Sequence, residues 1–169
     1  MVFIDETGLN TKLARLYGRC RRGERCLSAV PHGHWQSSTL IAALRHQQME
    51  APFLVEGPVD AEVFLVYLQQ VLVPCLQPGD MLILDNLATH KVQGMGPILS
   101  DRGVSLRYLP PYSPDLNPIE QAFAKLKAHL REAAARTLDD LQSAVAHSLD
   151  TFSASDCRAF FRHAQYASI

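Results

Sequence analysis

The hydrophobic residues in the first two thirds of this chain gather mainly in short runs bounded by Gly, Pro, Asp or Ser. Runs of this kind predict buried strands. The first run is predicted to end at Asp5, where the apolar residues stop. A further segment with two glycines, residues 15–31, predicts a twisted pair of strands. The predicted single strands are Val2–Ile4, Ser38–Leu44, Ala51–Val55, Met81–Leu84 and Val104–Leu109.

Helical spacing of apolar residues appears in the middle of the chain and dominates its end. Between Asp60 and Leu76 the apolar side chains recur at intervals of three and four, and Asp60 can cap this helix. A short helix is predicted over 92–101. Three prolines in 110–114 preclude a helix there. Strands come first along the chain, strands and helices alternate in the middle, and helices come last. This order predicts an α/β fold, with a mixed sheet flanked by helices and with C-terminal helices. Those last helices are predicted to begin at Pro118, Thr137 and Ser153.

Length and composition indicate one folded domain. The chain has 169 residues, of which 47% are hydrophobic and 20% charged, as in globular proteins with a sizeable core. The longest apolar stretch, Val63–Leu76, is too short to span a bilayer, so we expect no membrane partner. Nothing at the N-terminus resembles a signal peptide. The four cysteines lack the spacing of a zinc site or a disulfide framework. We therefore expect a single domain over 1–169 in the cytoplasm.

The charge of the chain is uneven. Its net charge is −1, which argues mildly against a dedicated DNA-binding module. From Lys12 to Arg25, however, six basic residues accompany a single acid. This basic segment, which includes Arg19 and Arg22, is either a solvated loop or a patch for phosphates. The sequence leaves both interpretations open.

Three acidic residues stand at the ends of predicted elements. Asp5 and Asp85 follow apolar runs directly, and Glu120 lies near the start of the helix from Pro118. If the two strands are neighbours, both carboxylates emerge at one sheet edge, where α/β folds form ligand sites. Carboxylates suit Mg²⁺. Two such ions, roughly 4 Å apart, can activate a water and stabilise the leaving oxygen of a phosphodiester.

Each acid also has a simpler interpretation. A lone Asp after a strand is often a turn residue, and Glu6 competes with Asp5 for the first position. Asn117, Pro118 and Glu120 have the spacing of an ordinary helix start, in which Asn caps the helix and Glu reaches back to the cap. The residues alone do not decide whether Glu120 is a cap or a metal ligand.

Three segments together resemble a known family. They are FIDETG (3–8), LILDNLATH (82–90) and LPPYSPDLNPIEQAFAKLK (109–127), which look like the three catalytic blocks of DDE transposases. The resemblance is closest to the bacterial insertion-sequence branch of the mariner-like superfamily. Asp85 and Glu120 have 34 residues between them, the interval typical of that group. The resemblance covers essentially the whole chain.

This resemblance implies an RNase H-like catalytic domain, with the first acid on the central strand, the second after the fourth strand and the third on a helix. It implies that Asp5, Asp85 and Glu120 bind two Mg²⁺ or Mn²⁺ ions. It also implies hydrolysis of DNA at transposon ends, followed by attack of the freed 3′-hydroxyl on target DNA. Further residues are expected to contact DNA, either beside the ions or along its backbone: Asn86, His90, Arg19, Arg22, Lys125, Lys127 and Arg131.

Full-length members of the family carry helix-turn-helix modules before the catalytic domain. Met1 lies only four residues before Asp5, so we expect that part to be encoded in a separate frame, lost or trimmed away. The chain alone would then bind transposon ends weakly and without sequence preference, and would work as a homodimer or with the missing half. The main alternative is a silent remnant that regulates full-length transposase. A junction resolvase is a weaker one, because of the proline-rich block before Glu120.

Overall fold

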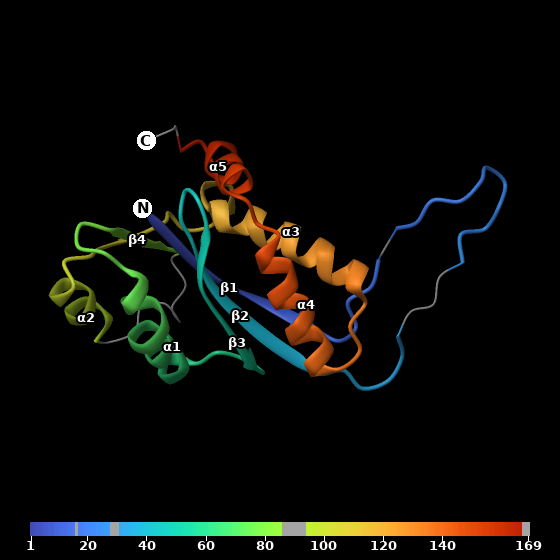
Figure 1. The fold of residues 1–169 in the computed structure, drawn as a ribbon, viewed down its shortest axis with the longest axis horizontal. Coiled ribbons are helices and arrows are strands. Elements are labelled where there is room, and N and C mark those ends of the chain that lie inside the picture. The colour runs from blue at the N-terminus through green and yellow to red at the C-terminus, as the bar shows by residue number, and fades with distance from the viewer. Residues whose placement is uncertain (16, 28–30, 86–93, 167–169) are drawn as a thin grey trace.

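The computed structural model describes residues 1–15, 17–27, 31–85 and 94–166. At its centre is a five-stranded sheet with the strand order β3-β2-β1-β4-β5 (Figure 1). Because β1 pairs antiparallel with β2 and parallel with β4, the sheet is mixed, as predicted. The strands are β1 Val2–Asn10, β2 Ser37–Leu44, β3 Met49–Glu56, β4 Met81–Leu84 and β5 Ser105–Tyr108.

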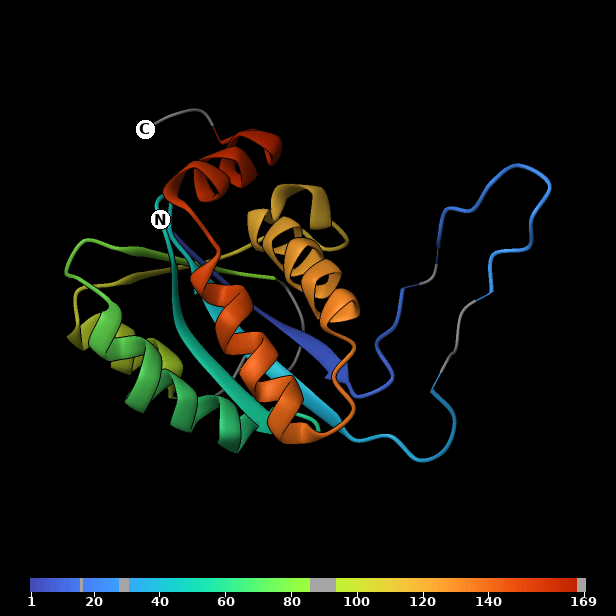
Figure 2. The ribbon, with the colours of Figure 1, turned by 45° about the vertical axis from the view of Figure 1, so that its right-hand side comes forward.

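Helices cover both faces of this sheet. Successive residues of a strand face opposite ways, so Val2 and Ile4 enter one hydrophobic cluster while Phe3 and Leu9 enter the other. The first cluster lies against α1 and α2, and the second against α3, α4 and α5 (Figures 1 and 2). Both clusters share one sheet, and the single-domain organisation stays a prediction. The helices are α1 Ala61–Tyr67, α2 Met95–Asp101, α3 Pro118–Ala133, α4 Leu138–Asp150 and α5 Ala154–His163.

Three of the helices are capped by a side chain at their predicted start. The side chains of Asp60, Thr137 and Ser153 each accept a hydrogen bond from the backbone N–H three residues further along. The helix predicted to reach Leu76 continues beyond α1 as a π-helical turn and then a 3-10 turn, so only its first part is α-helical. Among the residues that the structure describes, no helix has the length and apolar character that crossing a membrane requires.

Two predictions about the first part of the chain are wrong. β1 does not end at Asp5, because Glu6–Asn10 continue its ladder with β2 and bury Thr7 and Leu9. The strand pair predicted over 15–31 is not formed in the part of that segment that the structure describes. Its described residues are largely exposed, so no buried apolar face stabilises a hairpin there.

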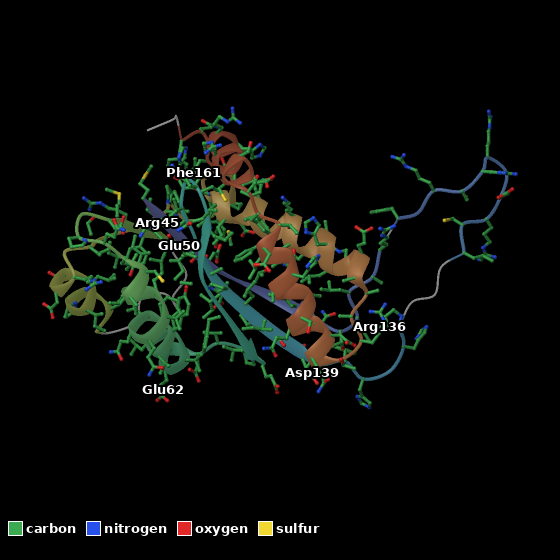
Figure 3. All side chains as sticks on the ribbon, in the orientation of Figure 1. Arg45, Glu50, Glu62, Arg136, Asp139 and Phe161 are labelled. Atoms are coloured by element: carbon green, nitrogen blue, oxygen red, sulfur yellow. The ribbon has the colours of Figure 1, made fainter. Side chains whose placement is uncertain are left out.

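The basic segment Lys12–Arg25 leads away from the body of the fold in its described part (Figures 1 and 2). Its base is tied to the end of α3. Nη1 of Arg136 donates to the carbonyl of Thr11 at 3.2 Å, and Arg15 forms an ion pair with Glu132. Figure 3 shows Arg136 at this base. The start of the basic segment is therefore fixed to the last turn of α3 by Glu132 and to the connection after α3 by Arg136.

Candidate active site

Asp5 and Asp85 come together because their strands are parallel neighbours. Ile4 of β1 pairs with Leu84 of β4, so the residue that follows each of them lies at the same level of the sheet. Asp85 directly follows β4, as predicted, whereas Asp5 lies inside β1. By strand alternation Asp5 shares the face of Phe3, which is the face covered by α3.

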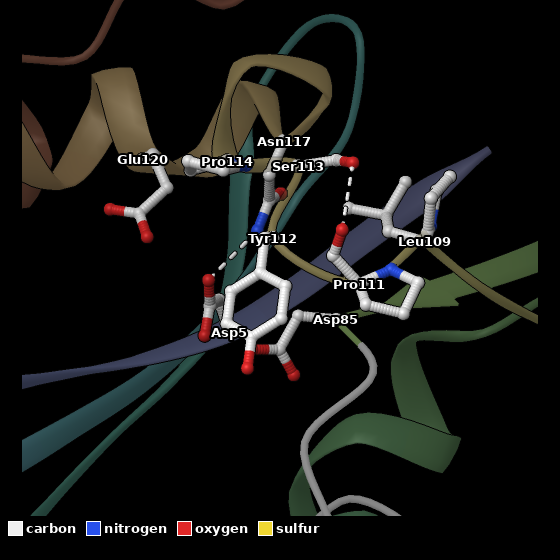
Figure 4. Close-up of a pocket in the computed structure, with 10 residues that line it drawn as sticks. Asp5, Asp85, Leu109, Pro111, Tyr112, Ser113, Pro114, Asn117 and Glu120 are labelled. Carbon is white, nitrogen blue, oxygen red and sulfur yellow. Dashed lines mark hydrogen bonds between the residues drawn. The ribbon is translucent and has the colours of Figure 1, made fainter.

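Glu120 reaches the same place from the first turn of α3. The buried residues Ile119 and Phe123 pack this helix on the sheet and leave Glu120 exposed at its start. All three acids line one pocket of about 320 Å³, together with Asn117 and residues 109–114. Figure 4 shows the three carboxylates around this pocket. Glu6, the alternative to Asp5, is not among its lining residues.

The Asp5 carboxylate is buried and hydrogen-bonded at both oxygens. Its side chain accepts from the N–H of Glu6 at Oδ1 and from Nδ2 of Asn117 at Oδ2, each at 2.8 Å. The pKa of Asp5 is raised to about 7, mainly because its carboxylate is buried; the bond from Glu6 opposes the rise, and the charges of Asp85 and Glu120 contribute to it. Negative charge is therefore concentrated in this pocket.

The start of α3 differs from the capping arrangement that its spacing allowed as one interpretation. Asn117 is the N-cap residue, but its side chain makes no capping hydrogen bond. Its backbone N–H donates to the carbonyl of Pro114 at 3.1 Å, and its side-chain amide donates to Asp5. The capping box that the spacing allowed is not formed: the Asn117 side chain is turned toward Asp5 on the central strand, and its backbone N–H belongs to the turn before the helix.

The donor chemistry of the pocket fits a divalent cation. Carboxylate oxygens are the ligands that Mg²⁺ prefers, and a cation would offset both the burial of the Asp5 carboxylate and its repulsion by Asp85 and Glu120, which raise its pKa. Among the described residues, however, no three Asp, Glu, His or Cys side chains converge closely enough to hold one ion. Asp5, Asp85 and Glu120 share a pocket without meeting at a single point, and they are the residues that could hold ions there.

The other residues predicted to contact DNA lie in different surroundings. Arg19 and Arg22 are exposed on the basic segment. Nζ of Lys125 lies 2.9 Å from Oδ2 of Asp156, so this lysine pairs with α5. Two of the predicted residues, Asn86 and His90, lie outside the described residues. The remaining two, Lys127 and Arg131, are half-buried on α3.

Sequence reasoning missed two residues of the pocket. Asn117 was interpreted only as a cap, and no local signal reveals its bond to Asp5, which is 112 positions away. Tyr112 lies in the segment where prolines preclude a helix; its φ is 56°, and its side chain is fully exposed on the pocket lining. The run of prolines around it was the available signal for an unusual backbone.

Several solved structures share this fold. The pre-cleavage Mos1 transpososome aligns with a TM-score of 0.78 at 16% sequence identity, covering 98% of this chain and 53% of that chain. The catalytic domain of Mos1 mariner transposase aligns with a TM-score of 0.70 at 15% identity, covering 98% and 77%. The likeness confirms the RNase H-like fold. This chain spans about half the length of the Mos1 chain in the transpososome.

Two comparisons of the sequence gave different results. A search of the curated proteins found no match, whereas a comparison with family models identified the family. Residues 1–142 match the DDE superfamily endonucleases, and this range includes all three acids of the pocket. The insertion-sequence branch of the resemblance stays a prediction. Fold and sequence agree, and the chain belongs to the DDE superfamily endonucleases.

Proposed function

We propose that this chain is the catalytic domain of a DDE transposase, which hydrolyses DNA at transposon ends and joins the freed 3′-hydroxyl to target DNA. The observation that carries the proposal is that Asp5, Asp85 and Glu120 line one pocket beside the central strands. Membership of the DDE superfamily endonucleases supports it. So does the likeness to Mos1, which has been crystallised as paired-end complexes with Mn and with Mg.

The proposed mechanism assigns the three acids to metal binding. When bound, two Mg²⁺ or Mn²⁺ ions would activate the attacking water or hydroxyl and stabilise the leaving oxygen. Asp5 offers a carboxylate held at both oxygens, and Glu120 offers an exposed one from α3. Asp85, at the end of β4, completes the set. Cleavage and joining are both displacements at phosphorus, so the same carboxylates serve both steps.

The proposal includes DNA contacts outside the pocket. Arg19 and Arg22 are exposed and can neutralise phosphates, which adds salt-sensitive affinity. Lys127 and Arg131 lie further along the helix that carries Glu120. Two transposon ends must be joined, so the working complex would contain at least two copies of the chain or a copy with a separate DNA-binding part.

A nicking assay on supercoiled plasmid tests the proposal. The wild-type chain is expected to nick DNA with Mn²⁺ and not with EDTA. Asp85→Asn and Glu120→Gln are expected to abolish nicking, because each removes one carboxylate charge from the pocket. Asp115→Asn is the matched control, since Asp115 is exposed in the 3-10 turn before α3 and does not line the pocket.

The outcome also separates the catalytic proposal from a silent regulator. If the wild type and Asp85→Asn behave identically with every metal and DNA substrate tested, the catalytic proposal fails. A wild-type chain that nicks DNA only with Mn²⁺ or Mg²⁺, alongside an active Asp115→Asn and an inactive Glu120→Gln, would support it.

A further inference from the structure

We propose that Asn117 is a positioning residue of this site. Its side-chain amide fixes the orientation of the Asp5 carboxylate and so prepares that carboxylate to bind divalent cations. The inference rests on the function proposed above, in which Asp5 is a metal ligand. It gives Asn117 a role beyond marking the start of α3.

The contacts of Asp5 carry the first step. Nδ2 of Asn117 donates to Oδ2, and the N–H of Glu6 donates to Oδ1. A carboxylate oxygen has two lone pairs, so each oxygen keeps one for a cation. Donors on both oxygens also resist rotation of the carboxylate group, which is how neighbouring groups orient metal ligands. Asn117 is the side-chain member of this pair of donors, so it can be tested by substitution.

An ordinary helix cap would use this asparagine differently. The side-chain oxygen of an N-cap Asn accepts a hydrogen bond from the first turn of its helix, and here that bond is absent. Asn117 is only 4% exposed, and its Oδ1 is buried without a hydrogen-bond partner among the described residues. An unpaired buried acceptor destabilises a fold. The stability of α3 therefore does not explain the placement of this amide, whereas its bond to Asp5 does.

Asn117 also connects the first acid to the third. Its backbone carbonyl accepts from the N–H of Glu120 at 3.2 Å, which begins the first turn of α3. Pro118 keeps the residue before it extended, and Asn117 has φ −106° and ψ 97°. From this backbone the side chain reaches β1 instead of folding over the helix. One residue thus holds Asp5 and sets the start of the helix that carries Glu120.

Calorimetric titration with Mn²⁺ alone tests the inference. Asn117→Ala is expected to lower the Mn²⁺ affinity about tenfold or more, as is typical when a partner of a metal ligand is lost. Asn117→Ser should lower it similarly, because Ser is a preferred N-cap residue but is too short to reach Asp5. Thr137→Ala is the matched control. It removes a working cap from α4 and should leave the Mn²⁺ affinity unchanged.

The outcomes distinguish the positioning role of Asn117 from the proposed metal binding on which it rests. Wild-type Mn²⁺ affinity in either Asn117 variant would overturn the positioning role. Loss of the fold in both variants would overturn it too, because the side chain would then be structural. If the wild type binds Mn²⁺ and Asp5→Asn does not, the proposed metal site stands whatever Asn117 does. A wild-type chain that binds no Mn²⁺ would overturn both.

Discussion

Arg45 holds both carboxylate oxygens of Asp80, with Nη1 at 2.8 Å from Oδ1 and Nη2 at 2.7 Å from Oδ2. Nε of the same guanidinium donates to Glu50 at 2.7 Å. Arg45 directly follows β2, and Asp80 directly precedes β4. The pair therefore joins the β2–β3 hairpin to β4, the strand that Asp85 follows. The hydrogen bonds from Arg45 lower the pKa of Asp80 below its ordinary value.

Asp80→Asn is expected to lower the free energy of unfolding at pH 7 by about 1.5–3 kcal/mol, because it breaks a charge-assisted, largely buried pair. A lowered pKa means that the stabilisation is complete above the ordinary value of 3.8 and is lost as the pH falls below it. Urea unfolding followed by circular dichroism should therefore show the wild type and the variant converging between pH 7 and pH 2.5. A difference that stays constant over this range would contradict the assignment.

Asp5→Asn is expected to stabilise the protein when metal is removed. At pH 8 in EDTA the wild type carries a buried carboxylate beside two other acids, and the variant removes that charge. The raised pKa of Asp5, about 7, corresponds to a gain on the order of 2–4 kcal/mol. The new amide can donate to the unpaired Oδ1 of Asn117 if the Asn117 amide turns over.

Thermal unfolding with and without Mn²⁺ measures how Asp5→Asn changes the stability of the metal-free and the metal-bound protein. Mn²⁺ should raise the melting temperature of the wild type, because binding to the folded state stabilises it, and should have little effect on Asp5→Asn. A variant that is less stable than the wild type in EDTA would show that the buried carboxylate is a structural group instead.

Ala134→Gly is expected to stabilise the fold by about 1 kcal/mol. Ala134 ends α3 in the left-handed region, with φ 50° and ψ 40°, where a Cβ atom is strained. Its N–H donates to the carbonyl of Leu130 at 3.0 Å, a bond that glycine retains. The matched control is Ala128→Gly, at an exposed position inside the helix, which should destabilise by about 1 kcal/mol. Chemical denaturation of the two variants is expected to give shifts of opposite sign.

The sequence predicted the sheet well because its strands are short, apolar and bounded by turn residues. Met81–Leu84 is one such run; the sequence leaves open whether it neighbours β1, and the structure pairs the two strands in parallel. The pattern misplaced the end of β1, because a polar residue inside a strand looks like its boundary. Asp5 stays in the strand because Glu6 and Asn117 donate to its carboxylate, and the second of these bonds is tertiary.

The candidate site was also predicted in part: the sequence selected its acidic residues but not the hydrogen bonds that hold them. Motif order and spacing selected Asp5, Asp85 and Glu120, which line one pocket. Local helix-start spacing indicated a cap at Asn117, but its side-chain amide is bonded to Asp5, because a residue whose type favours capping can find a tertiary partner instead. Packing of α3 on β1 decides that competition, and no local pattern records it. Local preference therefore located this helix start but not the bonds made there.

The double variant Arg19→Ala/Arg22→Ala tests whether the exposed basic segment binds phosphates. If both arginines contact DNA, the double variant should reduce the slope of log K against log salt concentration by about two. Fluorescence anisotropy with a labelled duplex, measured over a series of salt concentrations, gives this slope. The control is Arg102→Ala, because Arg102 follows α2 and its Nε donates to the carbonyl of Leu76, away from the basic segment. An unchanged slope in the double variant would identify the basic segment as a solvated loop, which is the other interpretation its sequence allows.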